Sequence, residues 1–599
     1  MRSWPGSNRP PTMPDGATRV SMATGGRSRH VGGTAPYLFL APYLLVFLPF
    51  FLLPALFSAF VSVTNWKIIG TPTFVGLQNY ARLLQDPLFT AALKNTLLYT
   101  AVIVPVMALL GLGLALLLNQ PLRGRVLTRL AVFGSYVIMV SVVGIIWRWI
   151  LDPTGAGILN YYLGRLGVAP LPWLAAPETA MLSIILATMW WTAGYNMVMY
   201  LAGLQDIPAE LREAVRMDGA NAWQEFWHLV LPCLRPVTFF VVVMSIAKSF
   251  QVFGQIYVMT QGGPSNSTLT IVHYLYVVGF TWFEMGYAAA IAYALFGLLL
   301  LVTIVQFRLV STEVGGAGVI RVEYLIRLGL YALMGLVLVL WLAPLLWVVS
   351  TSLKPEGQIL SLVPRWFPKT ITLENYLEVF QKFRLERWLL NSLVVAAGAT
   401  LLGLVVSVPA AYAFARMRFR GQQWLFILIL STILVPVHIT LVPLFIGLAK
   451  VKLTDTYFSL IMPTVANGFG VFLLRQFFRG IPRELEEAAV IDGATRLGVL
   501  VRIILPLSRP ALTAVAIFLF LLSWNDFMWP LIVTNTDATR TLPVGLATFV
   551  GGGTVGGQSI AYYGIGMAAS VMATIPAIIL FLALQRYFVQ GIALTGLKG

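Results

Sequence analysis

Long apolar runs separated by short polar segments fill most of this chain. A run of roughly 20 apolar residues is the length that an α-helix needs to cross a bilayer. Twelve runs approach this length, near residues 37–62, 94–118, 129–151, 179–203, 237–260, 285–309, 325–350, 388–415, 424–446, 457–478, 511–533 and 561–585. The pattern therefore predicts an all-α integral membrane protein with about 12 transmembrane helices.

The runs fall into two related sets of six, which predicts an internal duplication. The pair Asn79-Tyr80 returns as Asn375-Tyr376, a spacing of 296 residues (375 − 79). Each set has an even number of runs, so both halves are expected to start on the same side of the membrane, as parallel repeats. The expected organisation is a tail at 1–36, a first half at 37–310, a linker at 311–324 and a second half at 325–599.

The charged residues are few and mostly basic. They make up 11% of the chain, where a soluble domain has about 25%, and the net charge is +17. Short basic loops without acids mark the cytoplasmic side of a membrane protein. Two loops have this character, with Arg123, Arg125 and Arg129 in one and Arg416, Arg418 and Arg420 in the other. The charge thus predicts orientation in the cell membrane, with both termini cytoplasmic, and not nucleic-acid binding.

Two segments outside the apolar runs are expected to be flexible. The tail at 1–36 mixes arginines with Gly, Pro and Ser and has no apolar core of a signal peptide, so it is predicted to be a disordered cytoplasmic segment. The linker at 311–324 contains three glycines within a short stretch and is predicted to be a cytoplasmic tether.

The residues that usually carry enzyme chemistry are scarce. Cys233 is the only cysteine, which excludes an internal disulfide and a cysteine-based metal cage. The four histidines show no ligand spacing, and no nucleophile, base and acid stand in a recognisable pattern. The phosphate-binding signature G-x-x-x-x-G-K-[ST] does not occur in the sequence. We therefore expect a protein that is not an enzyme, with no cofactor and no metal, and any ATP hydrolysis on other chains.

One polar motif occurs twice, 274 residues apart (484 − 210). The segment 207–236 reads IPAELREAVRMDGANAWQEFWHLVLPCLRP, the segment 481–510 reads IPRELEEAAVIDGATRLGVLVRIILPLSRP, and they share 13 of 30 positions. Each is expected on the cytoplasmic side, between the fourth and fifth spans of its half. Acidic residues at the start favour a helix through its dipole, and a glycine after its last turn ends it. The motif thus predicts a short helix, a sharp turn and a second, amphipathic helix.

A shape kept in two copies predicts two equivalent docking surfaces, which suit a symmetric dimer of a soluble partner. A capped loop at the membrane surface explains one copy but gives no reason for the second. The residues that we expect to form these surfaces are Glu210, Glu213, Ala214, Asp218, Gly219, Glu484, Glu487, Ala488, Asp492 and Gly493.

The repeated motif resembles the cytoplasmic coupling loop of permeases from ABC-type importers. The match extends further, because YVMTQGGPSNST (257–268) and MGYAAAIAYAL (285–295) resemble the first permease subunit of the carbohydrate importers, the maltose and glycerol-phosphate type. NSLVVAAGAT (391–400), AAYAFARMRFRG (410–421) and SWNDFMWPLIV (523–533) resemble the second subunit. The chain departs from that pattern by joining two subunits into one, and by having Val215 where the motif prefers alanine.

The resemblance implies a permease that takes up carbohydrate across the inner or plasma membrane. It implies a dimer of cytoplasmic ATP-binding subunits at the coupling loops and an extracytoplasmic solute-binding protein at the other face. A 12-span secondary transporter of sugars or similar small polar solutes is the alternative, and a channel or structural membrane protein is a third class. A secondary transporter would more often carry coupling carboxylates in its spans, where this chain has chiefly Asp526.

Polar residues within the runs are the candidates for a sugar path. Amide, hydroxyl and aromatic groups suit a sugar, which has apolar faces and hydrogen-bonding edges. Tryptophans near span ends also serve as interfacial anchors, and serines also join helices. Lys248 is expected to meet either an acidic side chain or a substrate phosphate. The candidates are Trp191, Thr192, Asn196, Ser245, Lys248, Ser249, Gln251, Trp524, Asn525 and Asp526.

Overall fold

The computed structural model describes residues 33–68, 70–154, 157–309, 324–359, 363–433, 435–549, 554–555, 558–559 and 563–595. Most of the expected tail (1–36) and of the expected linker (311–324) lies outside the described residues. The described part is mainly helical, because apolar segments in a bilayer must pair their own backbone N–H and C=O groups.

The first half begins at α1 and ends at α15, with three short π-helical segments (η1 to η3) within it. Its elements are α1 (Ala35–Phe47), η1 (Leu48–Leu52), α2 (Leu53–Ser62), α3 (Gln78–Gln85), α4 (Pro87–Asn119), α5 (Arg125–Val137), α6 (Val140–Ile150), α7 (Ile158–Arg165), α8 (Pro177–Gln205), α9 (Ala209–Met217), α10 (Ala222–Glu225), η2 (Phe226–Val230), α11 (Leu231–Cys233), α12 (Arg235–Phe250), α13 (Gly254–Met259), α14 (Ile271–Tyr276), η3 (Val277–Thr281) and α15 (Met285–Leu309).

The second half begins at α16 and ends at α30, and it includes a two-stranded antiparallel pair. Its elements are α16 (Tyr324–Ser352), α17 (Glu356–Ile359), α18 (Glu374–Lys382), α19 (Leu385–Arg416), α20 (Gln422–Ser431), α21 (His438–Lys450), α22 (Tyr457–Val465), α23 (Gly468–Gly480), α24 (Glu484–Ile491), α25 (Arg496–Val499), η4 (Leu500–Ile504), α26 (Leu505–Leu507), α27 (Arg509–Trp524), α28 (Met528–Val533), α29 (Leu542–Ala547), β1 (Thr554–Val555), β2 (Gln558–Ser559) and α30 (Tyr563–Thr595).

Several spans are broken helices. Among the described residues, six helices are long and apolar enough to cross a membrane, and four bent pairs raise this number to ten if each pair is one span. The sharpest bend, 105°, separates α5 from α6. Of the other two apolar runs, 179–203 lies in α8, and 424–446 is divided between α20 and α21. The prediction of an all-α membrane protein is confirmed, although many of its spans consist of two pieces.

The duplication extends to the boundaries of individual elements. Four consecutive elements of the first half, η2, α11, α12 and α13, begin 274 residues before η4, α26, α27 and α28 (500 − 226, 505 − 231, 509 − 235 and 528 − 254). Both copies also bend where the motif re-enters the bundle, by 64° in the first half and by 82° in the second. The two halves are therefore parallel structural repeats, as the sequence predicts.

Asn79 and Asn375 have the same structural role in the two halves. Each side-chain amide donates to two backbone carbonyls where the first long helix of its half ends: from Asn79 to Ser62 (2.8 Å) and Thr64 (2.7 Å), and from Asn375 to Ser352 (2.9 Å) and Lys354 (2.7 Å). These bonds attach the short helices α3 and α18 to the ends of the preceding long helices. Buried carbonyls need such donors, which explains why the residue recurs.

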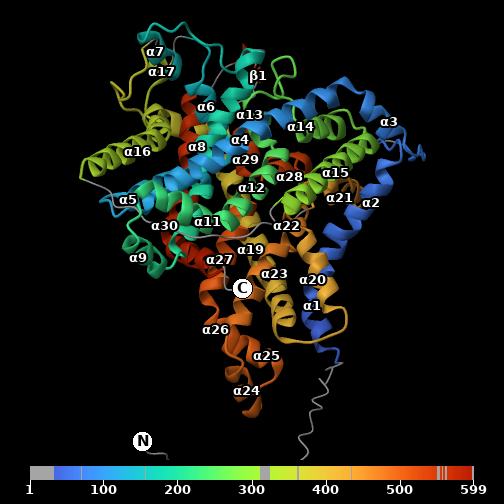
Figure 1. Ribbon diagram of the computed structural model, residues 1–599. Helices are drawn as coiled ribbons and strands as arrows, with labels where there is room; N and C mark the ends of the chain where they lie inside the picture. Colours follow the sequence, from blue (N-terminus) through green and yellow to red (C-terminus); the bar gives the residue numbers. More distant parts are fainter. Residues whose placement is uncertain are drawn as a thin grey trace, which may run out of the picture.

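The first helix of each half packs against the opposite half. α1 lies along α19 and α2 contacts α21, while α16 lies against α5 as well as α30. In Figure 1, α1 and α2 accordingly follow one side of the molecule and α16 the other. The two halves are therefore interlocked and do not merely lie side by side.

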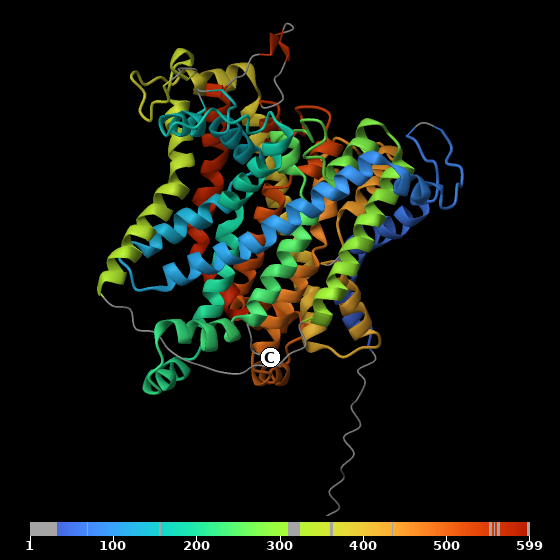
Figure 2. The same cartoon turned by 45° about the horizontal axis from the view of Figure 1, so that its top comes forward.

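The two ends of the bundle carry different elements. The segments that carry the repeated motif, α9 in one half and α24 and α25 in the other, project from the same end of the molecule (Figures 1 and 2). The helices α3, α7 and α17 lie at the opposite end. The two copies are therefore presented together on one face.

Candidate functional site

Both copies of the repeated motif form the predicted helix, turn and second helix. Gly219 follows α9 with φ +78°, and Gly493 follows α24 with φ +83°, the left-handed region that favours glycine. In the second copy, the N–H of Gly493 donates to the carbonyl of Val490 (3.0 Å) and the N–H of Ala494 to that of Ala489 (2.9 Å). This pair of bonds is the Schellman pattern, which satisfies the last carbonyls of a helix.

The residues that we expect to form the docking surfaces all lie on the outside of these loops. Each of the ten, from Glu210 to Gly219 and from Glu484 to Gly493, is exposed. Large apolar side chains beside them are exposed as well: Met217 (88%), Trp223 (68%), Ile491 (84%) and Leu497 (61%). Exposed apolar side chains grouped with carboxylates are typical of a protein–protein contact. Val215, the departure from the motif, is buried.

An ion pair fixes the second copy to the bundle. Arg416, the last residue of α19, places its Nε 2.6 Å from Glu486 Oε1 and donates from Nη2 to the carbonyl of Ile481 (2.5 Å). The side chains are only 6% and 14% exposed. Burial raises the pKa of the Glu486 carboxyl above its ordinary value, although the charges of Arg416 and Arg483 oppose the shift.

The first copy has no counterpart of this pair. The position equivalent to Glu486 is Arg212 (486 − 274), which donates to the carbonyl of Leu204 (2.8 Å). Sequence reasoning treated Arg416 as one of three loop charges that set orientation, and it missed the pair. The sequence did contain an indication of the pair, because Glu486 has no equivalent acid in the first copy.

The candidates on α8 and α12 lie close together. Asn196 Nδ2 is 3.5 Å from Ser245 Oγ and 3.3 Å from the carbonyl of Met107 on α4. Ser249 Oγ donates to Thr100 Oγ1 (2.9 Å), also on α4. Glycines allow these close approaches: a Cβ at Gly111 would lie 2.7 Å from Asn196 Cβ. The polar groups of α4, α8 and α12 therefore form one cluster inside the first half.

Other candidates are already bonded within the protein. Trp191 Nε1 donates to the carbonyl of Ile138 (2.9 Å), Thr192 Oγ1 to that of Thr188 (2.8 Å) and Gln251 Nε2 to that of Ala247 (3.0 Å). These bonds are typical of side chains that join or stabilise helices. The indole ring of Trp191 and the side-chain oxygens of Thr192 and Gln251 can still contact a substrate.

The second-half candidates lie where α27 ends. Trp524 is 1% exposed and its ring stacks on Phe520. Its Nε1, and also Oδ1 of Asn525, are buried without a hydrogen-bond partner in the part of the chain that the structure describes. A buried polar atom without a partner is costly, so these atoms are suited to meet a ligand or water. Asp526 follows directly and is partly exposed.

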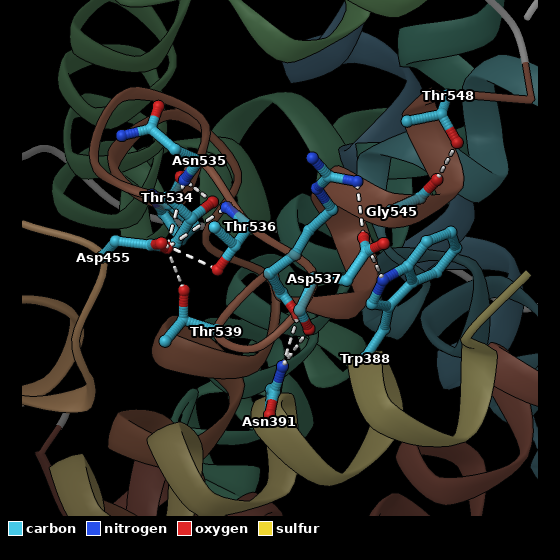
Figure 3. A network of polar contacts seen from close by, with 12 residues as sticks. Trp388, Asn391, Asp455, Thr534, Asn535, Thr536, Asp537, Thr539, Gly545 and Thr548 are labelled. Atoms are coloured by element: carbon cyan, nitrogen blue, oxygen red, sulfur yellow. Dashed lines mark hydrogen bonds and ion pairs between the residues drawn. The ribbon is translucent and has the colours of Figure 1, made fainter.

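At the end of the bundle opposite the repeated motifs, two aspartates hold the segment 534–541, which no sequence motif indicated (Figure 3). Asp455 accepts bonds from Asn535 N (3.1 Å), Thr536 Oγ1 (2.7 Å) and Thr539 Oγ1. Burial acts to raise the pKa of this carboxyl, but the hydrogen bonds outweigh it and leave the pKa below its ordinary value. The segment is thus fixed by an ionised acceptor.

The same segment is also tied to α19. Asp537 accepts from Trp388 Nε1 (3.1 Å) and pairs with Arg540 (2.6 Å), while Asn391 Nδ2 donates to the carbonyls of Asp537 (3.3 Å) and Arg540 (2.9 Å) (Figure 3). In the first half, Asn95 donates in the same manner to the carbonyls of Asn266 (2.8 Å) and Leu269 (3.0 Å). One asparagine in each half therefore anchors the corresponding segment at this end.

Metal binding has no geometric support in the described residues. No three His, Cys, Asp or Glu side chains among them lie close enough together to hold an ion.

Comparison with known proteins gives the same division into halves. The family model of the binding-protein-dependent transport system inner membrane component matches residues 97–311 and again residues 399–594. The arabinooligosaccharides transport system permease protein AraQ of Halalkalibacterium halodurans is 38% identical over 259 residues, 43% of this chain and 91% of the relative. AraP, of the same description, from Bacillus subtilis is 40% identical over 285 residues, 47% of this chain and 89% of the relative.

A solved structure is similar over a comparable length. It is a bacterial ABC transporter involved in the import of the acidic polysaccharide alginate, with a TM-score of 0.41 and 24% identity over 44% of this chain and 96% of that chain. Each relative thus corresponds to about half of the present chain, and the family model occurs once in each half.

Proposed function

This chain belongs to the family of binding-protein-dependent transport system inner membrane components, and from that premise we propose that it is the whole permease of an ATP-driven carbohydrate importer. The double match of the family model carries the proposal, since one polypeptide contains two permease domains. Membrane components of this family are not themselves the ATPase, so hydrolysis belongs to partner subunits.

The repeated motifs, now called the first coupling loop (207–236) and the second coupling loop (481–510), are the docking sites for those subunits. Both project from one end of the molecule, and both expose carboxylates and apolar side chains at their tips. Two similar docking surfaces match the two subunits of an ATPase dimer. When the dimer closes and opens, the loops transmit that movement through the bent connections to α12 and α27.

The orientation follows from this assignment. The face with the coupling loops is cytoplasmic, in agreement with the basic loop near Arg123. The halves 37–310 and 325–599 are joined by the segment 311–324, which acts as a tether only. The opposite face, with its two anchored segments, receives a solute-binding protein that delivers the sugar to the inner or plasma membrane.

The substrate path runs between the halves. Arabinooligosaccharide permeases are among the relatives, and polar and aromatic groups of α8, α12 and α27 suit a saccharide. The halves rock about this path, so that it opens to one face at a time. The ten candidate residues line it or hold the helices that do.

The energy source for sugar accumulation distinguishes this function from secondary transport. The tagged full chain, purified from its native membrane, should retain an ATP-binding subunit, and proteoliposomes containing this complex should accumulate oligosaccharide only with ATP. The chain freed of other proteins should hydrolyse no ATP. If that chain alone accumulates sugar in response to a proton or sodium gradient, it is a secondary transporter and the proposal is wrong.

A further inference from the structure

We infer that this permease selects an acidic saccharide, one that carries a carboxylate or phosphate group, and that the ammonium of Lys248 receives the acidic group. The inference rests on the proposed function, which it deepens by naming the substrate class. It does not follow from the family, because the observation that carries it is a single cation in one half of the chain.

Lys248 lies among three helices of the first half. It is on α12, and its Nζ is 3.8 Å from the ring centre of Tyr195 on α8 and 5.3 Å from that of Tyr136 on α5. Nζ is also 3.3 Å from the hydroxyl oxygen of Tyr136. A Cβ at Gly194 would lie 2.3 Å from the carbonyl oxygen of Val132, so a glycine is what brings α8 and α5 this close. The two rings therefore hold the ammonium between them.

The charge of Lys248 has no acidic partner. Among the described residues, Lys248 forms no ion pair. A cation within a membrane span is costly, and such residues normally pair with an acid or face a cavity or substrate pathway. Contact with two aromatic rings stabilises the ammonium less than a direct counter-ion would, because charge-assisted hydrogen bonds are among the strongest side-chain contacts. The site therefore has an unsatisfied preference for an anion.

The lysine is also accessible. It is an exposed residue although its end group contacts helices on two sides, and the neighbouring Tyr136 and Tyr195 are partly exposed. The lysine is therefore not enclosed by protein on every side.

The surroundings supply the remaining contacts that a saccharide needs. Ser245 lies one turn before Lys248 on the same face of α12. The Nδ2 atom of Asn196 on α8 is 3.5 Å from Ser245 Oγ. A hydroxyl and an amide suit sugar hydroxyls, and the tyrosine rings suit the apolar face of a sugar ring. The ammonium adds an ionic contact, which an acidic saccharide makes and a neutral sugar does not.

The repeat shows that this cation is not required by the architecture. The position equivalent to Lys248 in the second half is Leu522 (248 + 274), and the one equivalent to Ser245 is Leu519 (245 + 274). Both halves form the same helices at these positions, α12 and α27, so the fold is built equally well without the charge. The charge is a feature of the first half alone, as expected for recognition of one acidic group.

Matched pairs of ligands test the inference on the full chain in lipid nanodiscs. The probes are trimers of galacturonate and of glucuronate, each with its carboxyl-reduced neutral trimer, and glucose 6-phosphate with glucose. Binding is measured by calorimetry at low and high salt for the unmodified chain, Lys248→Met, Lys248→Arg and Lys94→Met. Lys94 is the control, because it is an exposed lysine on α4.

We expect the unmodified chain to bind the acidic member of at least one pair about tenfold or more tightly than the neutral member, since hydrogen bonds to charged groups contribute about 1.5–3 kcal/mol. Lys248→Met should remove this preference, because the charged contact is lost. Lys248→Arg should keep the preference, and Lys94→Met should change nothing.

Three results would overturn the inference. The first is equal binding of the acidic and neutral members by the unmodified chain, which needs no variant to fold. The second is an acidic preference that survives Lys248→Met. The third is binding of neither member of any pair, which removes Lys248 as a receptor for acidic saccharides and leaves the proposed function to its own test, ATP-dependent uptake.

Discussion

Replacing Gly219 or Gly493 with valine is expected to abolish sugar uptake while leaving the chain inserted in the membrane. Both glycines have positive φ, +78° and +83°, and a β-branched residue there is strongly strained. A Cβ at either position meets no atom within 4 Å, so the effect comes from the backbone alone and does not come from a clash. The strain should change the turn that aims each coupling helix at its ATPase subunit.

The measurement is ATP-dependent uptake in proteoliposomes, with insertion followed by yield and size-exclusion profile. Uptake should fall at least about tenfold, because a left-handed residue other than glycine costs roughly 1–2 kcal/mol and more when β-branched. Gly480→Val is the control, since this glycine precedes the second coupling loop, has no positive φ and also has open space at its Cβ. Normal uptake by both Gly219→Val and Gly493→Val would contradict the assignment of the coupling loops.

Replacing Arg416 with methionine is expected to loosen the second coupling loop and lower the stability of the chain. The change leaves Glu486 largely buried without its partner, and it also removes a donor to the carbonyl of Ile481. Loss of one member of a buried ion pair costs about 3–5 kcal/mol. The double variant Arg416→Met with Glu486→Met should recover most of that loss, because two apolar side chains leave no buried charge.

Thermal unfolding in detergent and ATP-dependent uptake are the measurements for this second prediction. Arg418→Met serves as the control, because Arg418 lies two residues away and is exposed. We expect Arg416→Met alone to reduce both unfolding temperature and uptake, and Arg418→Met to change neither. If Arg416→Met unfolds at the temperature of the unmodified chain, the ion pair does not fix the loop.

Much of the fold could be predicted because membrane burial imposes a strong pattern on sequence. The 274-residue spacing of the motif predicted a structural copy, and the element boundaries keep that spacing from η2 through α13. Asn79 and Asn375 marked the repeat correctly for a physical reason, since each satisfies two buried carbonyls. The glycine turns were predictable because few other residues tolerate positive φ.

Other features depend on contacts that hydropathy does not record. The 105° bend between α5 and α6 falls within a single apolar run, and the sequence there contains no proline. The packing of α1 on α19 depends on the shapes of helix surfaces far apart in the chain. Arg416 was interpreted as an orientation charge because its partner, Glu486, is 70 residues away (486 − 416).

The candidate site was predicted unevenly. All ten residues of the coupling loops are exposed, and their role in docking stays a prediction. The candidates inside the bundle could be selected by polarity only. Polarity does not separate Gln251, which bonds within its own helix, from Lys248, whose charge is left without an acid.

The number of chains in the assembled transporter tests the central claim most directly. The claim is that one polypeptide supplies both permease halves and both coupling loops. Native mass spectrometry of the complex purified from its own membrane should therefore find one copy of this chain with two ATP-binding subunits. A complex with two copies of this chain, or one whose ATP-binding subunits contact a different membrane subunit, would contradict the account.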